Sequence, residues 1–230
     1  MEAVQIRPIA RMKSDFATKF GIPRQSGLVE SLRSTIIFEP EFRNPDTLRG
    51  IEGYSHLWII WHFSEAVRQD WSPTVRPPRL GGNTRMGVFA TRSPFRPNSL
   101  GLSCVRLLGV EQTEENGTVI HVAGADLMDG TPIFDIKPYI PYADAHPDAL
   151  GGFTDAAKDY VLSVDFPAQL LNKLPEDKRT AAVDVLSHDP RPSYQQDSDR
   201  TYGLIFAGFD IRFTVTDNTL YVKDVVAHDH

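Results

Sequence analysis

The sequence has little cysteine: Cys104 is the only one among 230 residues. A single cysteine excludes a disulfide within the chain and a zinc site built from several cysteines. Because Cys104 lies in the apolar run LSCVRLL, we expect it to pack as a small hydrophobic side chain. No apolar run approaches the roughly 18 residues of a membrane span. The first residues, MEAVQIRPIARMKSDF, lack the apolar centre of a signal peptide, so we expect a soluble, cytoplasmic protein.

Several motifs that carry well-known chemistry are also missing. The sequence has no GxGxxG run between a strand and a helix, no P-loop, no GxSxG elbow and no HExxH helix. A Rossmann-type nucleotide site, a serine-hydrolase site and a zincin site are therefore not supported. His56 and His62 flank one apolar run, but no third ligand stands nearby. We interpret them as core or rim histidines and predict no metal.

Acidic side chains are absent from residues 71–110, although the whole chain has a net charge of −6. All the basic residues of this part are arginines: Arg76, Arg79, Arg85, Arg92, Arg96 and Arg106. Guanidinium groups suit phosphates and carboxylates, and they stack on bases. Residues 86–90, MGVFA, predict an apolar strand. The arginines therefore flank a buried element. A solvated basic loop is the alternative, but we favour an anion-binding pocket.

Short apolar segments separated by glycine and proline turns predict many β-strands and little helix in the first 140 residues. The predicted strands are Val4–Met12, Ser34–Phe38, His56–Phe63, Met86–Thr91, Leu100–Val110, Thr118–Ala125 and Thr131–Ile140. Residues 44–53 predict a short helix with Asn44 as its N-cap. This pattern favours a sandwich or a closed barrel, and it does not choose between them.

The composition changes at residues 141–158, which are rich in proline, alanine and glycine and predict a linker. The rest predicts a small α+β unit with a strand over 159–166, helices over 167–174 and 175–187, and strands over 201–206, 209–216 and 219–225. Asp217-Asn218 predicts a tight hairpin turn. We therefore expect one domain over 1–145 and a second over 146–230.

A second polar cluster lies at residues 126–139, DLMDGTPIFDIKPY. The composition of Asp129-Gly130-Thr131-Pro132 indicates a turn. Asp135 and Lys137 are two residues apart on a predicted strand, so both side chains leave from one face. They form either a plain surface ion pair or part of a reaction site, and the pattern alone leaves both open.

Three segments carry a family resemblance. RPPRLGGNTRMGVFATRSPFRPNSLG and DGTP-IFDIKPY resemble two signatures of the TrmO-type, or TsaA-like, methyltransferases, and HDPRPSY resembles a third. Ser99 departs from the pattern, because many relatives have proline there. The resemblance implies a mainly β fold: an antiparallel single-sheet β-barrel with a small α+β C-terminal domain. It also implies that tRNA is the substrate, with methyl transfer from S-adenosyl-L-methionine to N6 of threonylcarbamoyl-adenosine beside the anticodon.

The resemblance further implies site residues and a homodimer, with the cofactor held partly across the dimer interface. The implied cofactor contacts are Pro23, Arg24, Gln25, Ser64, Glu65, Arg92, Leu102, Asp126, Leu127, Met128 and Asp129. Relatives often carry a His-Gln-like pair where this chain has Ser64-Glu65. Asp135 with Lys137 would supply the catalytic base. We predict tRNA contacts at Arg76, Arg79, Arg85, Arg96, Arg191 and Tyr194, with Tyr194 stacking on a base of the anticodon loop.

Without the family resemblance, the residues are also compatible with two other classes of function. A noncatalytic RNA-binding module would use the same arginines for phosphates. A barrel that binds a small anionic metabolite would use them for a carboxylate or phosphate. Binding of S-adenosylmethionine and transfer of its methyl group to tRNA distinguish the enzyme from both.

Overall fold

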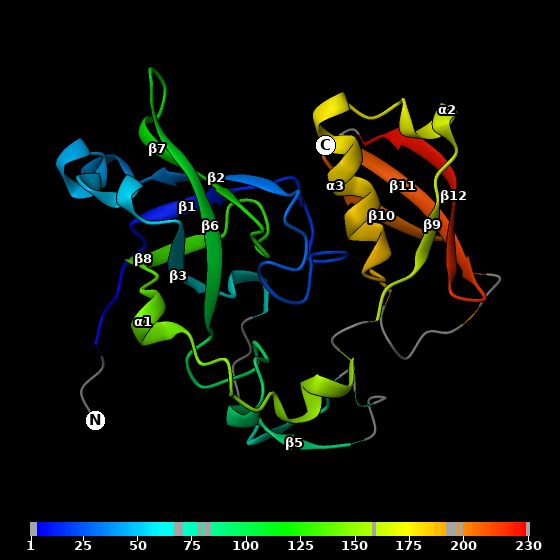
Figure 1. Cartoon of the computed structure of the whole chain (residues 1–230), viewed down its shortest axis with the longest axis horizontal. Helices are drawn as coiled ribbons and strands as arrows, with labels where there is room; N and C mark the ends of the chain where they lie inside the picture. The colour runs from blue at the N-terminus through cyan, green and yellow to red at the C-terminus, as the bar shows by residue number, and fades with distance from the viewer. Residues whose placement is uncertain are drawn as a thin grey trace. The chain divides into compact units, whose positions relative to one another are not determined.

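The computed structural model describes residues 4–66, 71–77, 80, 84–157, 160–191, 197 and 200–228. The chain divides into two compact units (Figure 1). The first comprises Met1–Ser14, Gln25–Trp71 and Pro94–Ala145, and the second comprises Asp15–Arg24, Ser72–Ser93 and His146–His230. The second unit thus takes two segments from the part of the chain before residue 145. Within the described residues, no helix has both the length and the apolar character that a membrane crossing requires.

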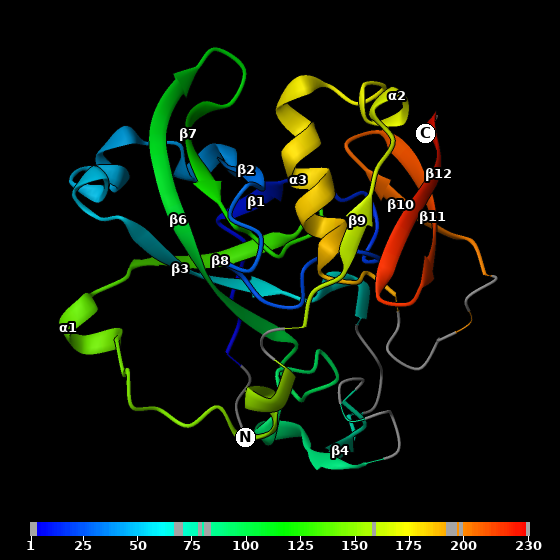
Figure 2. The same cartoon turned by 45° about the vertical axis from the view of Figure 1, so that its right-hand side comes forward.

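The first unit is built from six antiparallel strands that Figure 2 shows from a second side. They are β1 (Ala10–Lys13), β2 (Arg33–Phe38), β3 (His56–His62), β6 (Leu100–Thr113), β7 (Gly117–Ala123) and β8 (Pro132–Pro138). Their hydrogen-bonded order is β1-β2-β7-β6-β3-β8, and β8 pairs back to β1 with Ala10 opposite Ile133, which closes the barrel. Closure pairs the strand edges that an open sheet would leave exposed.

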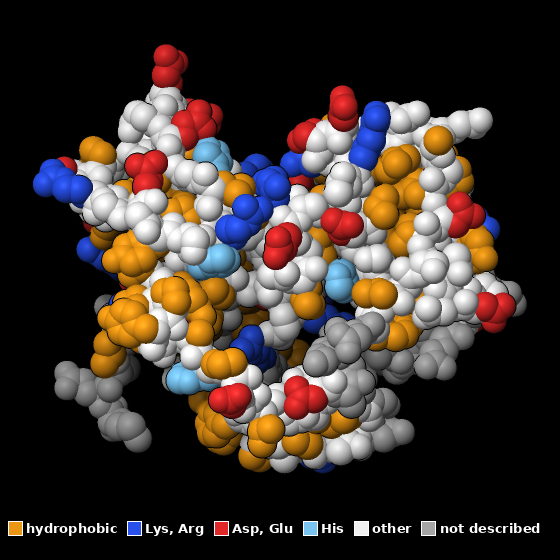
Figure 3. Space-filling model, viewed as in Figure 1, with side chains coloured by type: hydrophobic (Ala, Val, Ile, Leu, Met, Phe, Trp, Pro, Cys, Tyr) orange, Lys and Arg blue, Asp and Glu red, His pale blue; other side chains and the backbone are white. Residues whose placement is uncertain are grey.

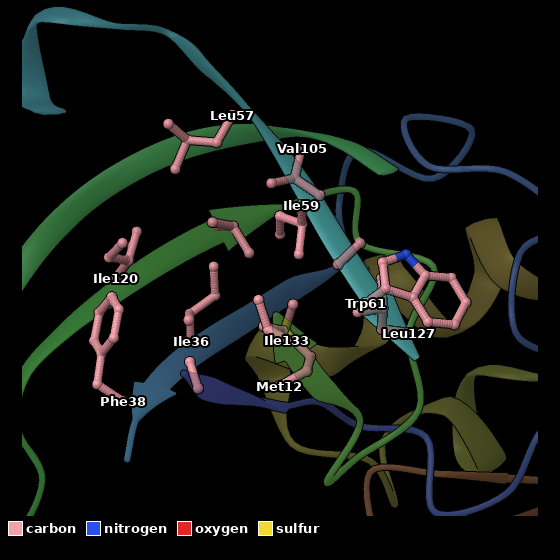
Figure 4. Close-up of a cluster of buried hydrophobic side chains, with 13 residues drawn as sticks. Met12, Ile36, Phe38, Leu57, Ile59, Trp61, Val105, Ile120, Leu127 and Ile133 are labelled. Atoms are coloured by element: carbon pink, nitrogen blue, oxygen red, sulfur yellow. The ribbon is translucent and has the colours of Figure 1, made fainter. Parts of the chain in front are cut away.

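Every second side chain along a strand points inward, and these side chains fill the barrel. In β3 the side chains of Leu57, Ile59 and Trp61 are buried, while the residues between them are half-buried on the outer wall. Figure 4 shows the resulting core. It consists of Ala10, Met12, Ile36, Phe38, Leu57, Ile59, Trp61, Val105, Ile120, Val122, Ala125, Leu127 and Ile133. The apolar strand pattern therefore positions one continuous core inside the ring of strands.

The helix predicted over residues 44–53 is replaced by short 3-10 helices, η2 (Pro45–Leu48) and η3 (Ile51–Gly53), which follow η1 (Pro40–Phe42). Asn44 is the N-cap as predicted, because its side chain accepts a hydrogen bond from Asp46 N. Gly50 has φ 87°, a left-handed conformation that separates the two short helices. A continuous helix was therefore the wrong prediction for this segment.

The second unit contains a four-stranded sheet in the order β10-β11-β12-β9. Its elements are β9 (Ser163–Asp165), α2 (Ala168–Leu171), α3 (Glu176–Ser187), β10 (Tyr202–Phe206), β11 (Phe209–Thr216) and β12 (Thr219–Ala227), preceded by η7 (Gly152–Ala157). Helix α3 buries Ala181, Ala182, Val185 and Leu186. Asp217 and Asn218 have φ of 49° and 63°, as the predicted tight hairpin turn requires.

Residues 15–24 belong to the second unit through specific contacts. The Phe16 side chain is 1% exposed, and its ring lies edge-on to Phe206 with 5.4 Å between centroids. Ala207 N donates to Asp15 O over 2.9 Å, and the Asp15 carboxylate pairs with Lys178 Nζ at 2.7 Å. Burial of one phenylalanine contributes about 1.5–3 kcal/mol. These contacts hold the segment against the C-terminal sheet.

The described part of residues 72–93 contains a two-stranded ribbon of β4 (Thr74–Val75) and β5 (Met86–Gly87), followed by η6 (Val88–Ala90). The strand predicted over 86–91 is therefore wrong beyond Gly87. Both the backbone N–H and the hydroxyl of Thr91 donate to Val88 O, which closes a helical turn. Val88 is buried at 1% exposure, whereas Phe89 is 74% exposed. The wider prediction of a mainly β chain with a small α+β part is confirmed.

Candidate functional site

Several predicted cofactor residues of the first unit lie at one end of the barrel. Trp61, near the end of β3, pairs with Gly101 on β6 and with Ile133 on β8. The Asp126–Asp129 turn joins β7 to β8 and therefore lies at this same end. Ser64 and Glu65 follow β3 in η4 (Ser64–Ala66), and Phe63 N donates to Ser99 O just before β6 over 2.9 Å. The barrel end thus brings the turn together with the end of β3.

The loop that begins at Gln25 lies beside the same part of the barrel. Ser26 Oγ accepts a hydrogen bond from Cys104 N over 3.1 Å, and Gly27 N donates to Gly124 O over 2.9 Å. These bonds attach the loop to β6 and to the end of β7. Leu102, on the outer wall of β6 near this loop, is 53% exposed. The loop that begins at Gln25 therefore lies beside the end of β7, just before the turn that carries the predicted carboxylates.

Asp129 holds the turn to the end of β1. Its carboxylate accepts from Ser14 N over 2.9 Å and pairs with Lys13 Nζ at 3.3 Å. Ser14 Oγ donates to Leu127 O over 2.9 Å, and Thr131 Oγ1 donates to Met128 O over 2.7 Å. The Leu127 side chain is 1% exposed and belongs to the core. The turn is thus fixed by Lys13 and Ser14 and by its own Thr131, which suits a rigid binding loop.

Asp126 is held by two residues that the sequence motifs did not single out. Ser103 Oγ donates to Asp126 Oδ1 over 2.6 Å, and Trp61 Nε1 donates to Ser103 Oγ over 2.9 Å. Ser103 is 1% exposed. A hydroxyl at an inward-facing position of an apolar strand is the signal that identifies it, because buried polar groups need hydrogen-bond partners.

Asp135 and Lys137 lie on the outer wall of β8. Their charged groups are 2.9 Å apart, and their side chains are 45% and 63% exposed. Ile60 pairs with Asp135 on one side and with Leu102 on the other, so these three residues form one cross-strand row. The prediction that both charges leave from one face of the strand is confirmed. Such an exposed pair contributes little to stability.

The predicted cofactor residues Pro23, Arg24 and Arg92 belong to the second unit. Pro23 is buried, while Arg24 and Arg92 are exposed. Arg24 Nη2 donates to Arg191 O over 3.4 Å. The structure therefore divides the predicted cofactor contacts between the two units.

Among the predicted tRNA contacts, Arg76 and Arg85 are exposed in the second unit, where Arg85 Nη1 donates to Thr74 Oγ1 over 3.0 Å. Arg96 belongs to the first unit and is half-buried. Arg79 and Tyr194 lie outside the described residues.

Arg191 forms a part-buried pair with Asp189 in the second unit. Arg191 Nε and Nη2 donate to the two carboxylate oxygens of Asp189 over 2.8 and 2.9 Å. The side chains are 11% and 12% exposed. The hydrogen bond to Asp189 raises the pKa of the Arg191 guanidinium. Burial and then the Asp189 charge raise the pKa of the Tyr160 phenol, which donates to Asp189 Oδ2 over 3.3 Å. Arg191 is thus engaged within its own loop.

The described residues contain no group of three or more His, Cys, Asp or Glu side chains placed to hold a metal ion. Cys104 is half-buried on β6. Burial, followed by the charge of Asp144, raises the pKa of the Cys104 thiol, so the thiol stays protonated at neutral pH. Packing is therefore the role that its surroundings favour.

Known proteins resemble the chain over nearly its whole length. The model of the tRNA-methyltransferase O N-terminal domain matches residues 11–145, and that of the TrmO C-terminal domain matches residues 159–228. The chain is 40% identical over 225 residues to the tRNA (adenine(37)-N6)-methyltransferase of Escherichia coli, covering 94% of this chain and 95% of that protein. It is 42% identical over 175 residues to the protein of the same name in Eikenella corrodens, covering 76% and 98%.

A solved structure agrees with these matches. The crystal structure of TrmO from Pseudomonas aeruginosa has a TM-score of 0.79 and 32% sequence identity, and the similarity covers 98% of this chain and 100% of that one. The resemblance found in the sequence signatures is confirmed by both family models and by the fold. This chain belongs to the TrmO family.

Proposed function

We propose that the chain is an S-adenosylmethionine-dependent tRNA methyltransferase that acts on N6 of adenine 37. The observation that carries the proposal is the 40% identity to the Escherichia coli enzyme over 94% of this chain. We further propose that the adenine is the threonylcarbamoylated form, as the sequence signatures imply. A cytoplasmic location follows from tRNA as the substrate.

We propose cofactor contacts at the end of the barrel in the first unit and from three residues of the second unit, Pro23, Arg24 and Arg92. A methyl group leaves a sulfonium when the nucleophile is aligned with the S–methyl bond at near-attack distance. Carboxylates and carbonyl oxygens of the Asp126–Asp129 turn would hold the cationic part of the cofactor, and Arg92 would bind its carboxylate. The remaining contacts proposed for the cofactor are Pro23, Arg24, Gln25, Ser64, Glu65 and Leu102.

The proposed base is Asp135, with Lys137 holding its carboxylate at 2.9 Å. A carbamoylated N6 is a poor nucleophile, so it must lose its proton as the methyl group is transferred, and a carboxylate in reach can accept that proton. For the tRNA we propose phosphate contacts from Arg76, Arg79, Arg85 and Arg96 and stacking by Tyr194. We propose Arg191 as a further contact to the tRNA phosphates.

We also propose a homodimer through the outer wall of β3, β6 and β8. Leu102 is 53% exposed there, and the neighbouring Trp58, Ile60 and Phe134 are half-buried. Hydrophobic side chains gather over α1 (Pro141–Asp144) and the adjoining ends of β3 and β8 (Figure 3). Contiguous exposed apolar surface is typical of interaction sites. A second copy on this wall would cover Leu102 and shield Asp135 from water.

The experiment that tests the function is transfer of labelled methyl groups from S-adenosylmethionine to tRNA with and without threonylcarbamoyl at adenine 37. We expect one methyl group per modified tRNA, located by mass spectrometry of the digested nucleosides. Cofactor binding without transfer would favour a metabolite-binding barrel. Binding of tRNA without binding of the cofactor would favour a noncatalytic RNA-binding module. Equal transfer to both tRNAs would overturn the threonylcarbamoyl requirement.

Arg92→Ala is expected to weaken S-adenosylmethionine binding by about 10- to 100-fold, because one charge-assisted hydrogen bond contributes roughly 1.5–3 kcal/mol. The thermal melt should stay close to that of the wild type, since Arg92 is exposed. Isothermal titration calorimetry measures the effect. Arg49→Ala, which removes an exposed arginine from an ion pair with Asp46, is the control and should bind normally. Wild-type affinity in Arg92→Ala would remove this residue from the site.

Arg76→Ala and Arg85→Ala are each expected to weaken tRNA binding and to reduce the slope of log K against log salt by about 1, because fewer counterions are released. Affinity for S-adenosylmethionine should not change. Filter binding over a range of salt concentrations measures the slope, with Arg7→Ala as an exposed arginine control in the first unit. An unchanged slope in both variants would assign these arginines to the structure of the β4-β5 ribbon.

A further inference from the structure

The hydrogen bonds at the barrel end have a fixed direction. An indole N–H only donates, so the Ser103 hydroxyl oxygen accepts from Trp61 over 2.9 Å. The single proton of that hydroxyl is then directed to Asp126 Oδ1 over 2.6 Å. A hydroxyl usually rotates among several partners, but here the donor on one side sets the partner on the other. Trp61 thus determines which atom Ser103 donates to.

Trp61 is itself held in one position. Its side chain is 7% exposed, and the Phe63 ring lies 4.2 Å away between centroids. The indole lies so close over Gly101 that a Cβ added there would be 2.2 Å from Trp61 Cε2. Glycine is therefore the residue that lets the indole sit against β6. Close packing therefore holds the Trp61 indole rigidly, and this indole is the first donor in the series Trp61–Ser103–Asp126.

The end of the series is the carboxylate of the proposed cofactor turn. A hydrogen bond from a buried hydroxyl to a carboxylate is stronger than a neutral one, and at 2.6 Å it is short. It restricts rotation of the Asp126 side chain before any ligand arrives. Pre-ordering of a binding group reduces the entropy that is lost on binding.

We propose that Ser103, oriented by Trp61, is a positioning residue that aims the Asp126 carboxylate at S-adenosylmethionine. This inference rests on the proposed function, because it requires the barrel end to bind that cofactor. Ser103 is buried at 1% exposure and acts through Asp126 without contacting the ligand. Trp61 contributes through the direction of its N–H and through the packing that keeps the indole in place.

The test is a double-mutant cycle on cofactor affinity. Ser103→Ala should raise the Kd for S-adenosylmethionine about tenfold, the effect of one hydrogen bond that orders a binding carboxylate. Trp61→Phe should raise it by less, because the Ser103 hydroxyl remains. The pair Ser103→Ala/Asp126→Ala should bind no more weakly than Asp126→Ala alone, since Ser103 acts only through that carboxylate. A residue that merely stabilises the barrel would instead give additive losses.

Thr118→Val is the matched control. Thr118 lies near the opposite end of β7, is 6% exposed and donates to Gln112 Oε1 over 2.6 Å. The variant removes a buried hydroxyl and its hydrogen bond without touching the Asp126–Asp129 turn, so its cofactor affinity should equal that of the wild type. The affinity for tRNA should stay unchanged in Ser103→Ala.

The outcomes separate this inference from the proposed function. A wild-type chain that does not bind S-adenosylmethionine would overturn the proposed function and the inference with it. Binding by the wild type with equal affinity in folded Ser103→Ala, or fully additive losses in the double mutant, would overturn the inference alone. If Ser103→Ala does not fold, Trp61→Phe decides: weaker binding supports the inference, and wild-type affinity overturns it.

Discussion

Replacing Asp135 with asparagine is expected to lower the turnover of tRNA methylation by roughly two to four orders of magnitude, the usual contribution of a general base. The amide has nearly the shape of the carboxylate but cannot accept a proton from N6. Stability should change by under about 1 kcal/mol, because exposed ion pairs contribute little. The pair with Lys137 is of this kind, with side chains 45% and 63% exposed. Affinity for S-adenosylmethionine should stay close to that of the wild type.

Single-turnover methylation of threonylcarbamoylated tRNA measures this effect, with cofactor binding determined on the same preparation. Asp46→Asn is the matched control, since it also removes one carboxylate from an exposed ion pair, that with Arg49. Its turnover should equal that of the wild type. Full turnover in Asp135→Asn would show that Asp135 and Lys137 form only a surface ion pair. Parallel loss of binding and turnover would place Asp135 among the cofactor contacts.

The strands could be predicted because their signal is local. The strand over Phe209–Thr216 has its predicted bounds, and β2 differs from its prediction by one residue. In β1 the prediction extended back to Val4, whereas the strand is Ala10–Lys13. Val4 is 87% exposed, because pairing of β1 with β2 begins at Ala10. Apolar character alone does not reveal where a partner strand begins.

Residues 15–24 show a second limit of the sequence. Nothing in that segment indicates that Phe16 packs on Phe206, 190 residues further along the chain. A contact of that kind depends on the whole C-terminal sheet being formed. Local patterns therefore predicted the elements, but not the assignment of this segment to the second unit.

The site was predictable where its chemistry was visible in the motif. The polar composition of residues 129–132 predicted a turn, and the two-residue spacing of Asp135 and Lys137 predicted a pair of neighbouring charges. Ser103 gave one signal, a hydroxyl at an inward-facing position of an apolar strand, but the sequence did not show which groups it and Trp61 would meet. Their role depends on the register that places Trp61 opposite Gly101. Register is a property of the paired strands, and one sequence segment does not reveal it.

Asp189→Asn is expected to lower the free energy of unfolding by about 1–3 kcal/mol, because removal of one partner leaves a part-buried charge without its counter-charge. Asp189 and Arg191 are 12% and 11% exposed, and two hydrogen bonds of 2.8 and 2.9 Å join them. Asp189 has φ 50°, a left-handed conformation that asparagine adopts readily, so this substitution isolates the charge from the backbone.

Asp210→Asn is the matched control for that loss. Asp210 pairs with Arg212 at 2.9 Å and at the same two-residue spacing, but the Arg212 side chain is 49% exposed. Solvent can therefore compensate the unpaired guanidinium, and the loss should stay under about 1 kcal/mol. Urea unfolding of both variants measures the difference, with tRNA affinity measured under native conditions. Equal small losses would show that burial adds nothing to the Asp189–Arg191 pair. A large loss of stability with unchanged tRNA affinity would assign Arg191 to the structure of its loop and remove it from the phosphate contacts.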